Sequence, residues 1–343
     1  MLLSIISPFY NSEQKCERLL RTLETLDAPD VELIFVDDGS TDGTLNVLSE
    51  FKGKAKLPTL IIPQSNKGPG GARNSGLKTA KGEYVWFVDS DDDINPEAIN
   101  VLRGRHSSGF DFIDFDIVSK GKQSNSMGCS SAEYTEKNDV KRILLENFGR
   151  ICSKMIRRKL LLENGILYPE MCIYEDNPMV FLYPFYVKSF MKADVVGYYH
   201  HEEHESVTRS GISPRFFDRM YTAEHGLKYG LQLCTNEKER DILRAKFTRL
   251  YFVNTAGQFV DRVPSKNWLV AGKIAKEYRK LMKTYELESV SLRNIGGSLN
   301  FRVRFLATWV LSYFIPSDPE FFEAQRIAAW GREFHWERTE PTQ

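Results

Sequence analysis

The 343-residue sequence has no excess of charge of either sign, because 46 lysines and arginines balance 46 aspartates and glutamates. This balance argues against a general nucleic-acid-binding surface, so we expect no nucleic-acid partner. Cysteine is scarce as well: the five residues are an odd number and form no CxxC pair. They are typical of free thiols in a reducing compartment, and they argue against a disulfide framework or a cysteine-rich zinc site.

Long apolar runs are also missing. A membrane-spanning helix needs about 20 apolar residues, and the longest candidate, residues 305–316, is too short. The first eight residues have neither a basic region nor a long apolar core, so they predict a first strand rather than a signal peptide. Together with the free thiols, these features predict a cytoplasmic protein.

What the sequence does have is an alternation of short apolar strands and helical segments. The four predicted strands cover residues 2–7, 31–36, 60–62 and 84–88. This spacing predicts βαβ crossovers, and hence an α/β fold with a mostly parallel sheet flanked by helices.

The alternation ends well before the C-terminus. Residues 110–118 predict a further strand, with antiparallel pairing as one option, and mainly helical patterns follow residue 214. We therefore predict an α/β domain over residues 1–212 and a mainly helical region over residues 213–343.

The fourth predicted strand ends abruptly in carboxylates, at Asp89, Asp91, Asp92 and Asp93. Ligands of parallel sheets gather beyond the carboxyl ends of the strands. Crowded acids repel one another unless a cation neutralises them, and oxygen ligands without cysteine suit Mg²⁺ or Mn²⁺. The alternative is a solvated acidic turn that caps the next helix near Asn95.

Two other loops follow predicted strands. Asp38 comes after the second strand, where it could accept hydrogen bonds from a base or a ribose, or cap the following helix. The glycine-rich residues 68–76 could cradle a phosphate, with Arg73 as a charged clamp. This loop is neither a P-loop nor a dinucleotide fingerprint, and an ordinary loop is the alternative.

Later in the chain, two more clusters could carry chemistry. Histidines 201 and 204 could contact a metal or a diphosphate, although their spacing is not that of the HExxH zinc motif. A polar loop with chance histidines is the alternative. Glu175 and Asp176 could supply a general base, or could instead cap a helix before Pro178.

Taken together and in this order, these motifs resemble glycosyltransferase family 2, whose members have the GT-A (Rossmann-like) fold. The resemblance extends from residue 4 to about residue 208 and is carried by residues 7–11, 36–44, 70–76, 88–92, 175–176 and 198–208. Two features depart from the family pattern. Cys152 stands near a frequent tryptophan position, and histidines follow the pair Tyr198-Tyr199 where an arginine is frequent.

The resemblance implies a role for each matched residue on the donor side. Pro8 and Tyr10 would line the nucleobase pocket, and Asp38 would bind the base, which is usually uracil. Arg73 would lie by the nucleotide.

The resemblance also implies the metal site. Asp89-Ser90-Asp91 matches the DxD motif, in which Asp89 meets the ribose. Asp91 would hold the divalent ion, Mn²⁺ or Mg²⁺, that bridges the donor diphosphate. His201 or His204 falls where the family often has a basic or metal-binding residue near the diphosphate.

The implied activity is inverting, metal-dependent transfer of a hexosyl or N-acetylhexosaminyl group from a UDP-sugar. The acceptor would be a hydroxyl of a glycan or lipid-linked molecule in bacterial capsule, lipopolysaccharide O-antigen or teichoic-acid synthesis. Glu175-Asp176 matches the catalytic pair, with Asp176 as the base.

Two other functions are weighed against this one. One is a nucleotide-sugar-binding protein without transferase activity, against which the intact Asp89, Asp91 and Asp176 argue. The other is a sugar nucleotidyltransferase, which would carry its glycine-rich loop directly after the first strand.

Residues 297–316 begin with basic residues and continue with an aromatic-rich stretch. Such a helix could lie peripherally on the inner face of the cytoplasmic membrane. The alternative is a helix packed against the catalytic domain or against a second subunit of a homo-oligomer.

Overall fold

The computed structural model describes residues 1–201, 214–262, 267–287, 299–332, 334 and 336. These residues divide into two compact units. The first unit contains residues 1–171, 182–201 and 336, and the second contains residues 172–181 together with the described residues from 214 to 334. The boundary predicted between residues 212 and 213 lies outside the described residues.

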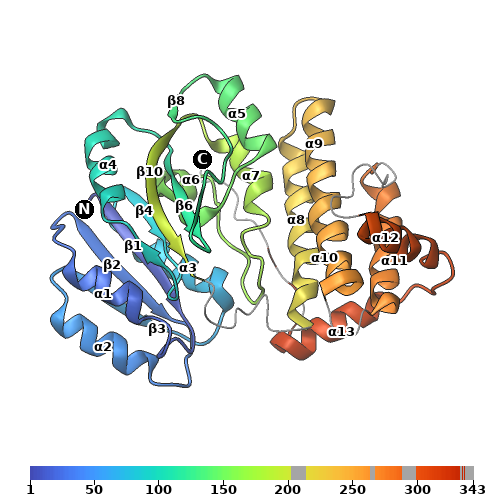
Figure 1. Cartoon of the computed structure of the whole chain (residues 1–343), viewed down its shortest axis with the longest axis horizontal. Coiled ribbons are helices and arrows are strands. Elements are labelled where there is room, and N and C mark those ends of the chain that lie inside the picture. Colours follow the sequence, from blue (N-terminus) through green and yellow to red (C-terminus); the bar gives the residue numbers. More distant parts are fainter. Residues whose placement is uncertain (202–213, 263–266, 288–298, 333, 335, 337–343) are drawn as a thin grey trace. The chain divides into compact units, whose positions relative to one another are not determined.

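The first unit is built on one mixed sheet (Figure 1). The strand order of this sheet is β3-β2-β1-β4-β9-β6-β10-β5. Strand β1 pairs in parallel with β2 and β4, and β2 pairs in parallel with β3. The strands are β1 (Leu3–Phe9), β2 (Val31–Asp37), β3 (Thr59–Pro63), β4 (Tyr84–Phe87), β5 (Asp93–Ile94), β6 (Phe112–Ser119), β7 (Lys122–Ser124), β8 (Ala132–Tyr134), β9 (Lys154–Arg157) and β10 (Phe190–His200).

Strand β9 is the antiparallel member at the centre of this sheet. It pairs antiparallel with both β4 and β6, so β6 runs in the same direction as β4. Strand β10 is parallel to β6. The option of an antiparallel strand at residues 110–118 is therefore correct for the pairing with β9 and wrong for the pairing with β10. The mostly parallel sheet flanked by helices is confirmed.

Helices cover the two faces of the sheet because alternate strand residues point to opposite sides. Apolar residues of α1, α2 and α4 pack on one face, against side chains such as Ile5, Phe35 and Trp86. Helix α3 lies on the other face, where Gly76 sits so close to Ile6 that a Cβ would come within 2.3 Å of its side chain. The helices of this unit are α1 (Glu17–Thr25), α2 (Thr44–Lys54), α3 (Gly68–Thr79), α4 (Glu97–Arg105), α5 (Lys137–Glu146) and α6 (Arg158–Glu163). Helix α7 (Met179–Tyr186) begins in the second unit and ends in the first.

The second unit is mainly helical in its described residues from 214 onward, as the sequence predicts, whereas residues 172–178 form turns and irregular backbone. Its helices are α8 (Asp218–Leu233), α9 (Glu237–Phe247), α10 (Asn254–Gly257), α11 (Trp268–Thr284), α12 (Leu299–Leu311) and α13 (Pro319–Trp330), with π-helical turns at Thr248–Val253 and Gln258–Arg262. None of the described helices has the length and apolar character that crossing a membrane requires.

Candidate functional site

Three neighbouring parallel strands end at one edge of the sheet in the first unit. Strands β1 and β2 are in register to their last residues, Phe9 and Asp37, and the Val88 amide after β4 still bonds to the carbonyl of Ile6. The loops that follow are joined, because the hydroxyls of Ser12 and Ser90 lie 2.9 Å apart. The loops that carry most of the predicted donor-site residues therefore meet at this edge.

The loop after β1 presents Tyr10 to solvent. Its successor, Asn11, has a left-handed backbone with φ of 48°. Two hydrogen bonds fix this turn: the Asn11 amide donates to Ser40 Oγ at 3.0 Å, and the Thr41 amide donates to Asn11 Oδ1 at 2.8 Å. The ring of Tyr10 is thus exposed on a fixed loop, and the preceding Pro8 is partly exposed beside it.

Asp38 is buried and held by a chain of hydrogen bonds. Its Oδ1 accepts from Gln64 Nε2 at 2.7 Å and from the Lys67 amide at 2.9 Å. Gln64 in turn accepts from Ser75 Oγ at 2.6 Å, so its amide orientation is set. Burial raises the pKa of Asp38 above its ordinary value, while these hydrogen bonds oppose the rise. The carboxyl of Asp38 is therefore preorganised at the end of β2.

Arg73 projects from α3 and pairs with Asp89. Its Nη2 lies 2.6 Å from Asp89 Oδ1, and its guanidinium lies 5.7 Å from the centroid of the Tyr168 ring. The Arg73 side chain is buried, whereas the Asp89 side chain is 41% exposed. The buried cation therefore holds an acid that can still reach a ligand.

Asp92 is the buried centre of the carboxylate cluster. It accepts hydrogen bonds from the Tyr198 hydroxyl at 2.7 Å and from the His201 amide at 2.8 Å, and it contacts His200 Nδ1 at 3.1 Å. The Tyr198 hydroxyl also accepts from the Asp89 amide at 3.2 Å. The hydrogen bond to Asp92 raises the pKa of His200. Asp92 thus ties the acid loop to the end of β10.

The roles of Tyr198 and His200 were missed in the sequence, although both belong to the Tyr-Tyr-His ending of the predicted strand there. Their contact with Asp92 spans more than a hundred residues, so only the sheet order could reveal it. The side chain predicted to bind a metal belongs to His201, whose backbone alone is engaged by Asp92. His204 lies outside the described residues.

Asp91 differs from its neighbours, because no other described residue donates a hydrogen bond to its carboxylate. Burial, together with the charges of Asp89 and Asp92, raises the pKa of Asp91 to about 6. An acid in this state favours a cation beside it. Among the described residues, no group of three or more His, Cys, Asp or Glu side chains could hold a metal ion by itself. The site instead fits Mg²⁺ or Mn²⁺ bound through one or two carboxylates plus phosphate oxygens.

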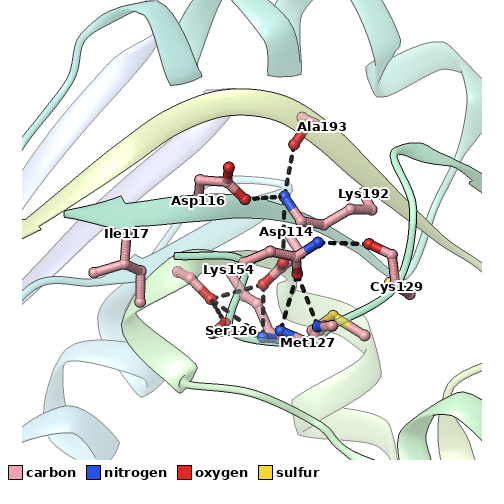
Figure 2. Close-up of polar contacts among 12 residues, drawn as sticks. Asp114, Asp116, Ile117, Ser126, Met127, Cys129, Lys154, Lys192 and Ala193 are labelled. Atoms are coloured by element: carbon pink, nitrogen blue, oxygen red, sulfur yellow. Dashed lines mark hydrogen bonds and ion pairs between the residues drawn. The ribbon is translucent and has the colours of Figure 1, made fainter. Parts of the chain in front are cut away.

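A second D-x-D sequence, Asp114-Phe115-Asp116, lies inside β6 and has a different environment (Figure 2). Asp114 Oδ1 accepts from Lys154 Nζ at 2.7 Å, and Asp116 Oδ1 accepts from Lys192 Nζ at 2.7 Å. Both lysines are buried. Each acid of this pair therefore has its own internal cation, which leaves no charge for a metal to neutralise.

In the second unit, Glu175 is buried and Asp176 is exposed. Helix α8 anchors the segment around them. Asp218 Oδ2 accepts from the Ile173 amide at 2.9 Å, and the Arg219 guanidinium lies 4.0 Å from the centroid of the Tyr174 ring. Of the two acids, Asp176 is thus the one presented to solvent, on a segment fixed by helical contacts.

Asp218 is itself held by α13. The Trp330 indole donates to Asp218 Oδ2 at 2.9 Å, and Arg326 Nε lies 3.4 Å from Oδ1. Burial raises the pKa of Asp218 to about 6, against the lowering effect of these partners. Helix α13 was not predicted from the sequence, so this support for the Asp176 segment was missed as well.

Comparison with known proteins identifies relatives of this arrangement. Residues 4–165 match the sequence profile described as Glycosyl transferase family 2. The chain is 28% identical over 302 residues to the poly(ribitol-phosphate) beta-N-acetylglucosaminyltransferase TarS of Staphylococcus aureus, covering 78% of this chain and 50% of TarS. It is 38% identical over 176 residues to a poly(ribitol-phosphate) beta-glucosyltransferase of Bacillus spizizenii, covering 49% of this chain and 27% of that protein.

Among solved structures, residues 1–349 of S. aureus TarS in complex with UDP-GlcNAc superpose with a TM-score of 0.65 at 25% identity, covering 91% of both chains. The predicted GT-A fold is confirmed by this similarity. The chain spans half or less of the full length of the TarS and glucosyltransferase sequences that it matches.

Proposed function

We propose that the chain is a family 2 glycosyltransferase, on the match of its residues 4–165 to that family's profile, and that it transfers a sugar from a UDP-sugar to a hydroxyl of a glycan or lipid-linked acceptor. The observation that carries the proposal is the carboxylate of Asp91, which forms no ion pair with another described residue, beside the Arg73–Asp89 pair at the carboxyl edge of a parallel sheet. Such an edge is where α/β sheets bind nucleotides.

The donor side of the proposal uses side chains that are already fixed. Tyr10 offers an exposed ring for a base to stack on, and Asp38 offers an acceptor for its N–H groups. Asp89, held by Arg73, accepts from the ribose hydroxyls. Because the hydrogen bonds of Asp38 and the ion pair of Asp89 are already formed, ordering these two side chains costs little entropy when the donor binds.

Asp91 is the residue that we assign to the metal. Bound there, Mn²⁺ or Mg²⁺ would supply positive charge to the departing diphosphate. Arg73 cannot fill that role alone, because Asp89 already neutralises it. His201 and His204 stay predictions as further contacts to the metal or the diphosphate.

Asp176 is the proposed general base, and the buried Glu175 next to it supports the segment. Asp176 takes the proton of the acceptor hydroxyl, whose oxygen bonds to the anomeric carbon while the bond from that carbon to the UDP oxygen breaks. Attack from the face opposite the nucleotide inverts the configuration. Exposure of the Asp176 side chain is consistent with contact to a large acceptor.

The relatives guide the choice of substrates for the test. UDP-GlcNAc and UDP-glucose are the first donors, and poly(ribitol phosphate) is the first acceptor. We expect UDP release that depends on acceptor, that stops in EDTA and that returns with Mn²⁺ or Mg²⁺. Release of pyrophosphate would instead identify a nucleotidyltransferase, and donor binding without turnover of any acceptor would favour a binding protein. Activity unchanged by EDTA would remove the metal from Asp91.

The base is tested by Asp176→Asn. We expect transfer to be abolished while calorimetry still detects donor binding, because the donor residues lie in the other unit of the chain. Asp241→Asn is a matched control, since Asp241 is another exposed acid of the helical unit. Loss of donor binding in Asp176→Asn would contradict the assignment of a base.

A further inference from the structure

Strand β9 enters the sheet from the edge that carries the acid cluster, because it runs antiparallel to β4. Its register sets Met155 against Trp86, so each residue before Met155 lies one step closer to the carboxyl end of β4. The 3₁₀ turn before β9 (Ile151–Ser153) contacts β4, β6 and β10, and Trp86 Nε1 donates to the Cys152 carbonyl at 2.7 Å. Arg150 directly precedes this turn, so its backbone lies at the same edge as the acids that follow β4.

Electrostatic effects on Cys152 agree with this placement of Arg150. Burial raises the pKa of the Cys152 thiol, the charges of Asp89 and Asp92 raise it further, and the charge of Arg150 lowers it. The acids and the guanidinium therefore act on the same side chain. Because β4 and β9 are neighbours in the sheet, Arg150 lies one strand beyond the position that we assign to the metal at Asp91.

Buried polar groups hold the backbone of Arg150. Its carbonyl accepts from Lys154 Nζ at 2.9 Å, and Ser153 Oγ lies 2.8 Å from the same carbonyl oxygen. These two side chains also contact Asp114 Oδ1, at 2.7 Å and 2.6 Å, respectively. The buried ion pair of Lys154 and Asp114 (Figure 2) thus has a second effect, because it fixes the backbone from which the Arg150 side chain projects.

The side chain of Arg150, in contrast, is exposed, and its guanidinium forms no ion pair or hydrogen bond within the described part of the chain. Arg73, the other arginine near the acids, is buried and paired with Asp89. A guanidinium offers five N–H donors in a planar arrangement that matches the oxygens of a phosphate. An unpaired guanidinium on a fixed backbone beside the acid cluster is therefore suited to bind a phosphate group.

We propose that Arg150 binds a phosphate group of one of the two substrates of the transfer reaction. The inference rests on the proposed function and adds a residue that none of the sequence motifs includes. Two substrate phosphates share the required chemistry: the diphosphate of the donor, and a phosphate carried by the acceptor. In either case Arg150 supplies positive charge that Arg73, which is neutralised by Asp89, does not supply.

Binding measurements on Arg150→Gln separate the two sources of phosphate. Calorimetry with UDP and Mn²⁺ measures the donor arm, and cosedimentation with poly(ribitol phosphate) measures the acceptor arm. We expect one of the two affinities to fall by about tenfold, because a charge-assisted hydrogen bond to a phosphate is lost. Weaker binding of UDP assigns Arg150 to the donor diphosphate, and weaker binding of the polymer alone assigns it to the acceptor. The difference from wild type should shrink as salt is raised, which a merely structural role of Arg150 would not produce.

A matched variant controls for the loss of one positive charge. Arg142 is another exposed arginine of this unit, and it is already paired with Asp139 and Glu146, so Arg142→Gln should leave both affinities unchanged. Arg150→Lys keeps the charge and should recover part of the affinity, and circular dichroism verifies that all variants are folded.

Two results would overturn the inference and leave the proposed function intact. One is equal binding of both probes by the wild type and Arg150→Gln, and the other is an equal loss of affinity in Arg142→Gln. A wild-type protein that binds neither UDP nor the polymer would instead contradict the proposed function together with this inference.

Discussion

Two D-x-D sequences belong to the same sheet, and they differ in their position relative to the strand that carries each of them. Asp89-Ser90-Asp91 follows the end of β4, whereas Asp114-Phe115-Asp116 lies within β6. In the second, alternation along the strand sends both acids to one buried face, where two lysines compensate them. In the first, the turn separates the acids: Asp89 pairs with Arg73, whereas Asp91 forms no ion pair with another described residue.

A D-x-D sequence therefore does not by itself identify a metal site. Internal lysines make the β6 pair a structural element, and Lys154 lies 4.6 Å from the centroid of the Phe148 ring in addition to its contact with Asp114. A carboxylate becomes available for a ligand when the fold supplies no counter-charge. We therefore expect activity to depend on the first pair and stability on the second.

The largest effect is expected for Asp91→Asn. Transfer should fall by about a thousandfold, because a metal clamp contributes several kcal/mol to the reaction. The melting temperature should stay unchanged or rise, since the substitution removes repulsion from Asp89 and Asp92. Steady-state kinetics and thermal unfolding give the two readings. A variant that keeps its activity would contradict the distinction between the two acid pairs.

For Lys154→Met we expect the main effect on stability rather than on transfer activity. Removing this cation leaves the buried Asp114 with only the more distant Lys192 Nζ, at 3.9 Å, so the free energy of unfolding should fall by about 3–5 kcal/mol. Denaturant titration measures the loss. The double variant Asp114→Asn/Lys154→Met should recover part of it, because the two changes are coupled. Additive losses would show that the ion pair is not what stabilises this face of the sheet.

Tyr198→Phe should have a smaller effect on stability. The change takes a donor from the buried Asp92 and an acceptor from the Asp89 amide, for an expected cost of about 1–3 kcal/mol. Chemical denaturation checks this value, and donor affinity should fall with it because the acid loop loses a support. Tyr199→Phe, on the next residue of β10, is the matched control.

The smallest effect is expected for Arg103→Gln, which breaks the ion pair with Asp30, whose two side chains are 34% and 36% exposed. Such pairs contribute about 1 kcal/mol or less. The hydrogen bond from Arg103 holds the pKa of Asp30 below its ordinary 3.8, so the pair stabilises the fold above that pH and loses its effect as Asp30 is protonated. Unfolding at pH 7 and pH 3 should therefore show a small difference between wild type and variant that shrinks at the lower pH.

Much of the first unit was predictable from the sequence, because each βα step has its own local pattern. The β4 acids were also recognisable, since they follow an apolar strand directly. Strand β9 was not: four residues are too few to show a period, and its pairing with β4 and β6 is a long-range property. The contacts of Asp92 could not be predicted either, because its partners Tyr198 and His200 come from β10, more than a hundred residues further along the chain.

Long-range contacts also explain what could not be predicted around Asp176. Its neighbours in the sequence suggest an irregular segment, and the sequence does not reveal that Asp218 of α8 and Trp330 of α13 fix it. Those contacts join residues about 45 and 112 positions apart along the chain.

The anchoring of Ile173 by Asp218 has a consequence for dissecting the protein. Residues 172–181 are an outlying piece of the helical unit, although they lie in sequence between parts of the α/β unit. A shortened protein that ends before α8 would keep every side chain that we assign to the donor. It would also keep Asp176 in its sequence, but without the helix that gives this residue a fixed position. A single truncation would then separate donor recognition from proton removal. The sequence motifs would all still be present, so they would not reveal that Asp176 had lost its fixed position.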